Sequence, residues 1–78
     1  MSIIVVDRQK MVNLRVRAGF TQNSLAKASG TSSALISRVE SGSTNLRPSN
    51  AIKICRALGV EFDEVFSLSE QNRMEVIA

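Results

Sequence analysis

The stretch TQNSLAKASGTSSALISRVESG, which ends at Gly42, constrains the fold more than any other part of the chain. Thr21 suits a helix N-cap, because its hydroxyl can accept a hydrogen bond from a free N–H group of the first turn. Gly30 suits the end of that helix, where a positive φ is favoured. Thr31 or Ser32 can cap a second helix, which Gly42 ends. The spacing therefore predicts two short helices joined by a tight turn.

The apolar residues of these two helices are spaced to pack against a core. The first helix has an apolar face with small side chains: Leu25, Ala26 and Ala28. In the second helix, Leu35, Ile36 and Val39 form one buried stripe. The opposite face of that helix carries small or polar side chains and one arginine: Ser33, Ala34, Ser37 and Arg38. This is the pattern of a helix-turn-helix whose second helix can enter the major groove of DNA.

A further helix is predicted before this pair. Asp7 is a suitable N-cap, and the helix runs to about Ala18, with Met11, Leu14 and Ala18 facing inward. Phe20 is expected to fold back onto the core.

A fourth helix is predicted to begin at Pro48, whose missing N–H is harmless in the first turn, and to end at Gly59. Its core face is expected to consist of Ala51, Ile52, Ile54, Cys55 and Leu58. Leu46 is expected to anchor the loop before it. The spacing of Phe62, Val65 and Phe66 predicts a short fifth helix.

The two ends of the chain are apolar and typical of strands. Residues 2–6 read SIIVV and residues 74–78 read MEVIA, with a polar segment at 67–73. The ends can pair as a small antiparallel sheet, within one chain or between two, or they can fray as termini commonly do. The sequence predicts one domain over residues 1–78, with an all-α core of five helices over residues 7–66 and these terminal strands at 2–6 and 74–78.

Charge is distributed unevenly along the 78 residues, although the net charge is only +3. Residues 8–56 hold nine basic side chains and a single acid, Glu40, whereas residues 57–78 hold five acids and one arginine. This distribution is either a solvated surface that happens to segregate or a positive face for a polyanion. The second interpretation agrees with the polar face of the third helix.

Composition argues against several other classes of protein. The chain has no histidine and one cysteine, and it shows no metal-ligand cluster, glycine-rich phosphate loop or pair of catalytic carboxylates. We expect no enzyme activity, cofactor, metal or small-molecule ligand. A lone thiol, no secretory signal and no apolar run of about 20 residues favour a cytoplasmic protein without a membrane span.

Several residue pairs together resemble the xenobiotic-response-element/Cro–C1 helix-turn-helix family. The matching positions are Leu14-Arg15, Gly19-Phe20-Thr21-Gln22, Leu25-Ala26, Gly30-Thr31, Ile36, Val39-Glu40, Ser41-Gly42 and Ala57-Leu58-Gly59-Val60. The resemblance implies a five-helix, lambda-repressor-like domain that binds double-stranded DNA as a dimeric transcriptional regulator. The loop after Gly42 is similar to that of restriction–modification controller proteins, while the strand-like ends are similar to those of small cytolysin-type repressors.

The resemblance also implies roles for individual residues. The groove-facing positions are Ser33, Ala34, Ser37 and Arg38. Gln22 matches a position that typically meets the DNA backbone. Further candidates for backbone contact follow from their polar side chains and their places near the third helix, not from the resemblance: Ser32, Ser41, Thr44, Asn45 and Arg47. Arg15 and Glu40 match an ion pair that ties the first helix to the third.

Chemistry separates these residues further. Arg38 can grip guanine with two parallel hydrogen bonds, or it can contact a phosphate or a surface acid. Ala34 suits a thymine methyl group, or it simply permits close approach. The helix carries few base-reading groups, so DNA shape is expected to contribute to specificity.

A small reader of one half-site usually acts as a dimer on a (pseudo)palindromic operator. The apolar residues available for a homodimer interface are Phe62, Val65, Phe66 and Leu68. A repressor, a controller protein and an antitoxin that also binds a partner protein remain alternatives. A protein-interaction module without DNA binding is disfavoured by the basic stretch.

Overall fold

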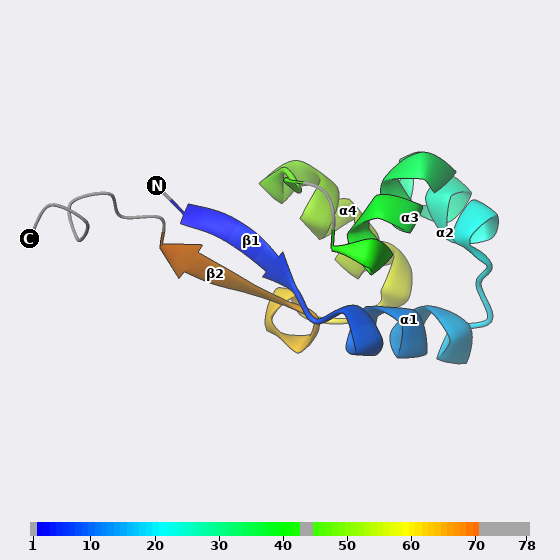
Figure 1. Ribbon diagram of the computed structural model, residues 1–78. Helices are drawn as coiled ribbons and strands as arrows, with labels where there is room; N and C mark the ends of the chain where they lie inside the picture. The colour runs from blue at the N-terminus through cyan, green and yellow to red at the C-terminus, as the bar shows by residue number, and fades with distance from the viewer. Residues whose placement is uncertain (1, 43–44, 71–78) are drawn as a thin grey trace, which may run out of the picture.

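The computed structural model describes residues 2–42 and 45–70. A helical body carries a two-stranded ribbon that extends away from it (Figure 1). The elements in chain order are β1 (Ser2–Val6), α1 (Arg8–Arg17), α2 (Gln22–Ser29), α3 (Ser33–Ser41), α4 (Pro48–Leu58), a 3₁₀ turn η1 (Phe62–Glu64) and β2 (Phe66–Glu70).

The local signals that predicted α2 and α3 are confirmed. The Thr21 hydroxyl accepts a hydrogen bond from the Ser24 backbone N–H, and the Ser24 hydroxyl accepts one from the Thr21 N–H. Ser32 caps α3 by accepting a bond from the Leu35 N–H at 3.1 Å. Gly30 and Gly42 end the two helices with φ of 72° and 75°, a conformation that costs other residues energy. Side-chain caps at the N-termini and positive-φ glycines at the C-termini therefore set the boundaries of both helices.

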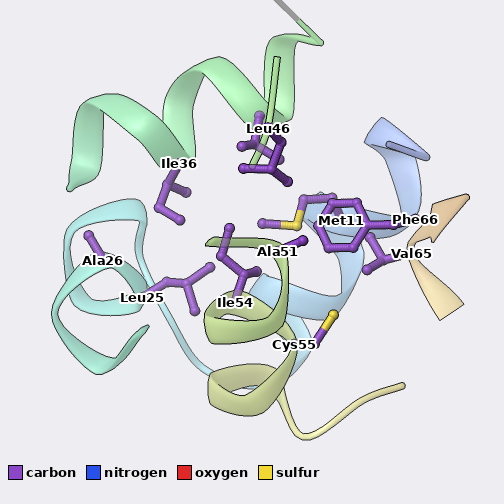
Figure 2. Packing of buried hydrophobic residues seen from close by; sticks show 11 residues of the cluster. Met11, Leu25, Ala26, Ile36, Leu46, Ala51, Ile54, Cys55, Val65 and Phe66 are labelled. Carbon is purple, nitrogen blue, oxygen red and sulfur yellow. The ribbon is translucent and has the colours of Figure 1, made fainter. Parts of the chain in front are cut away.

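One core connects all four helices with the start of β2 (Figure 2). Met11, Leu25, Ile36 and Ile54 are completely buried, one from each helix. Phe20 and Leu14 pack against this core, as predicted. The remaining buried apolar residues are Ala26, Val39, Leu46, Ala51, Cys55, Val65 and Phe66.

Three residues predicted to face the core are exposed. Ala18 is the C-cap of α1, outside its helical stretch, and Ala28 lies on the outer face of α2. Ile52 is 40% exposed. At 100° per residue, Ile52 is rotated by roughly 100° from the inward stripe of Ala51, Ile54 and Cys55. The prediction placed too wide a stripe on α4.

The predicted helical fold with a short two-stranded sheet is present, but the predicted count of five helices is wrong. The described residues contain four α-helices, and the expected fifth helix is the three-residue turn η1. Val65 leaves helical geometry at φ −133°, and the chain continues as β2. Val65 and Phe66 are buried, so the apolar spacing reported burial correctly but not the type of element.

The predicted N-terminal strand is confirmed, but its partner is different from the one predicted. β1 pairs with β2 in antiparallel register, with Ile4 opposite Leu68 and Val6 opposite Phe66. The predicted strand 74–78 lies outside the described residues. Ile4 and Val6 pack against the core, which fixes one face of the ribbon to the helical body. No helix in the described ranges is long and apolar enough to cross a membrane.

The two isoleucines of α4 provide a matched test of this core. We expect Ile54→Ala to lower the free energy of unfolding by about 2–5 kcal/mol, because it leaves a cavity in a fully buried site. Ile52→Ala removes the same atoms from a partly exposed site and is expected to cost less than about 1 kcal/mol. Urea denaturation monitored by circular dichroism measures both. Equal losses would contradict the orientation of α4.

Candidate nucleic-acid interface

The outer face of α3 forms an exposed surface opposite its buried stripe. Ser33, Ala34, Ser37 and Arg38 are all exposed, whereas Ile36 and Val39 are buried. The four exposed positions lie one turn apart in pairs, so they share one side of the helix. Below, this set of four residues is called the α3 outer face. The structure therefore brings all four predicted groove-facing residues together.

The N-cap serine and the last residue of α3 are engaged in local hydrogen bonds. Ser32 is exposed and uses its hydroxyl oxygen as the N-cap acceptor. The Ser41 hydroxyl donates to the Arg38 carbonyl at 3.0 Å. Both hydroxyls thus support the ends of α3.

The loop before α4 contributes two more exposed polar side chains. Asn45 and Arg47 are exposed, and Arg47 is the N-cap of α4 without a side-chain capping bond. Leu46 between them is buried, which confirms its expected role as an anchor. Thr44, the other predicted loop contact, lies outside the described residues.

The predicted ion pair between α1 and α3 is present and largely shielded from water. Arg15 Nε lies 2.5 Å from Glu40 Oε2, and Arg15 Nη2 donates to Glu40 Oε1 at 3.2 Å. The side chains are only 15% and 8% exposed. The third donor, Nη1, bonds the Phe20 carbonyl at 3.0 Å. The planar Arg15 guanidinium thus makes two hydrogen bonds to the Glu40 carboxylate and a third to the backbone carbonyl of Phe20.

Gln22 lies at the same site, which the sequence did not indicate. Its Nε2 donates to Glu40 Oε1 at 3.0 Å, and its side chain is half-buried. Glu40 therefore accepts bonds from residues of both α1 and α2. Eighteen residues separate Gln22 from Glu40, and no local pattern in the sequence reports such a pairing.

A second long-range contact at the end of α3 was also missed. Arg8 Nη1 donates to the Ser41 carbonyl at 3.1 Å. A cation near the last carbonyls of a helix is favourable. The Arg8 side chain also packs against Gly42: a Cβ added to Gly42 would lie only 2.9 Å from Arg8 Cδ. The first residue of α1 therefore supports the last turn of α3.

The four residues predicted for a dimer interface have unequal environments. Val65 and Phe66 are 2% and 3% exposed, because the monomer uses both in its own core. Phe62 is half-buried, with its ring centroid 5.4 Å from that of Phe66. Leu68 is 65% exposed. Buried side chains offer little surface to a second copy, so Leu68 is the strongest of the four for such a contact.

Cys55 is buried in the core on α4. Burial raises the pKa of its thiol, and the negative charges of Glu61 and Glu64 raise it further. A reactive cysteine needs the opposite conditions, namely exposure and a lowered pKa. Across the described part of the chain, no group of three or more metal-ligating side chains gathers.

The sequence and the fold were compared with known proteins. A model of the helix-turn-helix family matches residues 12–65. The chain belongs to the helix-turn-helix family of the Cro/C1 type. It is 31% identical over 65 residues to the uncharacterized HTH-type transcriptional regulator YgzD of Bacillus subtilis, covering 83% of this chain and 98% of that protein.

Two crystal structures resemble this helix-turn-helix protein. One is the restriction-modification controller protein C.AhdI from Aeromonas hydrophila, with a TM-score of 0.69 and 33% identity over 73% of this chain and 83% of that one. The other is the hypothetical transcription factor NHTF from Neisseria, with a TM-score of 0.66 and 27% identity over 95% of this chain and 91% of that one. The family is one of transcriptional regulators with a DNA-binding fold.

Removal of Arg15 is expected to destabilise the fold. Arg15→Ala leaves the Glu40 carboxylate buried without its main partner, at a cost of about 3 kcal/mol. For a domain of this size that corresponds to a fall in Tm of about 10 °C or more. Thermal unfolding by circular dichroism measures it, with exposed Arg17→Ala on the same helix as the control. Equal Tm values for both variants would show that the ion pair contributes no stability.

The Cys55 thiol is expected to react slowly while the protein is folded. At pH 8 we expect a thiol-specific disulfide reagent to modify it about 100-fold more slowly in buffer than in 8 M urea, because opening must precede reaction. The raised pKa means that folding favours the neutral thiol. The stability that this contributes is present below pH 9.0, the ordinary thiol pKa, and is lost above it. Fast modification in buffer would contradict the burial.

Proposed function

We propose that this protein binds a (pseudo)palindromic DNA operator as a homodimer and regulates transcription, with α3 in the major groove. The observation that carries the proposal is the exposed α3 outer face, which no other described element covers. Membership of a DNA-binding regulator family supports it. Most of the basic side chains also fall in residues 8–56, the part of the chain that holds the helices.

Base reading is assigned chiefly to Arg38. It is exposed on the α3 outer face, and a guanidinium can donate two parallel bonds to O6 and N7 of guanine. Ser33 stands at the first position of α3, where side chains approach base edges first, while Ala34 offers a methyl group for thymine. Ser37 completes the surface with a hydroxyl that can donate or accept.

Phosphate contacts are assigned to residues on either side of α3. Asn45 and Arg47 are exposed in the loop that follows it, Ser32 is its N-cap and Ser41 is its last residue. Gln22 is the first residue of α2, next to free backbone N–H groups. Its bond to Glu40 uses one N–H of the side-chain amide, which leaves the other N–H to donate to a phosphate.

The likeness to C.AhdI favours one particular role, that of a controller protein that acts on its own operon. That structure belongs to a restriction-modification controller protein and shares a third of its aligned residues with this chain. A mobility-shift assay with the DNA upstream of the chain's own gene tests this role. Binding to that DNA no tighter than to a shuffled duplex would leave the operator elsewhere.

The operator assignment is tested by selecting bound sequences from random duplex DNA with wild type, Arg38→Ala and Arg47→Ala. Wild type is expected to select a two-fold symmetric site with half-sites about 34 Å apart. Arg38→Ala should lose about 1–3 kcal/mol of binding and relax the preference for guanine at one position of each half-site. Arg47→Ala should weaken all sequences alike and reduce the dependence of affinity on salt.

Circular dichroism of Arg38→Ala and Arg47→Ala is the control that checks whether both variants are folded. If Arg47→Ala lost the sequence preference and Arg38→Ala kept it, Arg47 would be the base-reading residue and Arg38 the phosphate contact. A wild-type protein that binds no duplex at low salt would refute the function itself.

A further inference from the structure

The ribbon formed by β1 and β2 has one edge that the helical body leaves open. The outer side of β1 faces a groove of about 490 Å³, closed on its other side by Val39, Asn45 and Leu46. β2 lies on the side of β1 away from α4 (Figure 1). Ser67, Leu68 and Ser69 are all exposed. The β2 edge is therefore the accessible edge of the sheet.

The backbone of Leu68 points toward this open edge. The Asp7 N–H donates to the Val65 carbonyl at 2.9 Å, and these two residues continue the register of the ladder. Hydrogen-bonded pairs alternate with non-bonded pairs in an antiparallel ladder. Ser67 and Ser69 thus bond to β1, whereas Phe66 and Leu68 direct their N–H and C=O groups outward. No described residue bonds to those outward groups.

The Leu68 side chain is itself unusual for a small monomer. It is the most exposed large apolar residue among those described, at 65%. It stands at the middle of β2, two residues from either end. Leu68 therefore offers both an exposed apolar side chain and outward backbone groups, and an added strand could cover the first and bond to the second.

We propose that a second copy of the chain pairs along β2, with the two-fold axis at Leu68, to form a continuous four-stranded sheet. This inference deepens the homodimer of the proposed function and rests on it. Antiparallel pairing about that axis places each Leu68 opposite the other in a hydrogen-bonded pair. An isolated two-stranded ribbon is only marginally stable, whereas a sheet of four strands is substantially more stable.

Charge and geometry favour a second copy of this chain as the occupant. Residues 66–69 carry no charge, so the strands meet without like charges at the axis. Each chain has one acidic turn, η1. In the dimer the two turns lie beyond opposite ends of the paired strands. The two Phe66 residues are about 13 Å apart across the pairing, and the turns are farther apart still. This exceeds the Debye length of about 8 Å at physiological salt.

The pairing also relates the two helical bodies by a two-fold axis, which is the symmetry of a (pseudo)palindromic operator. Each β2 begins beside its own helices and runs away from them (Figure 1). Antiparallel pairing therefore puts the two bodies at opposite ends of the sheet, related by a two-fold axis. Each body keeps its α3 outer face free of the interface.

Substitution of Leu68 tests the interface without disturbing the core. In Leu68→Lys two ammonium groups would lie side by side at the axis, which is unfavourable for directly opposed residues. We expect the dimer dissociation constant, measured by analytical ultracentrifugation, to rise about tenfold or more. Val16→Lys, on α1 at a residue 59% exposed, is the matched control and should leave it unchanged.

Cross-linking provides a second and direct readout. Two opposed residues of a hydrogen-bonded pair have Cα atoms about 5.5 Å apart, which a disulfide can bridge. Oxidation should convert Leu68→Cys, but not Val16→Cys, into a covalent dimer that still binds the selected operator. The buried native Cys55 is shielded from this reaction.

The outcomes separate this interface from the function on which it rests. An unchanged dissociation constant in Leu68→Lys, or equal cross-linking of both cysteine variants, overturns pairing along β2. Operator binding by wild type would then still stand, with a different dimer surface. A wild-type protein that is monomeric when bound to its operator overturns the interface and the homodimer together.

Discussion

The position of α3 depends on one carboxylate. Glu40 accepts bonds from Arg15 of α1 and from Gln22 of α2. Charges removed from water are costly unless their hydrogen-bonding groups are satisfied. This network meets that condition because Glu40 accepts from two donor atoms of Arg15 and one of Gln22, and Arg15 donates a further bond to the Phe20 carbonyl. These bonds therefore hold α3 at a fixed angle to the two helices that precede it.

The network is needed because the apolar core is small. A 78-residue chain buries a limited fraction of its surface, and eleven apolar residues form the core seen here. Apolar contacts alone tolerate small rotations of a short helix, whereas directed hydrogen bonds do not. The core buries the apolar side chains, and the Glu40 network adds stability together with a directional constraint on α3.

Local physical signals predicted most of the helical body and much of the candidate interface. The capping bonds of Thr21 and Ser32 involve residues only three positions apart, so the sequence reports them directly. The α3 outer face follows from helical periodicity alone. The Arg15–Glu40 pair was found through family resemblance, because twenty-five residues separate its members.

The errors have equally physical causes. Phe62, Val65 and Phe66 fit a helical spacing, but tertiary pairing with β1 draws Phe66 into a strand. Alternation of Phe66, Ser67, Leu68 and Ser69 is a period-two signal that indicated this strand, and the polar composition of the segment obscured it. The bonds Gln22–Glu40 and Arg8–Ser41 join distant positions, and no local pattern encodes them.

The packing of Arg8 over Gly42 has a consequence for how sequences of this kind can diverge. Position 42 needs a residue that accepts φ of 75°. Any side chain added there would also collide with Arg8. A side chain at 42 requires Arg8 to move aside or to be replaced by a shorter residue, and either change disturbs its hydrogen bond to the Ser41 carbonyl. The two sites, thirty-four positions apart, are therefore coupled: a side chain gained at position 42 disturbs the contact that Arg8 makes with the end of α3.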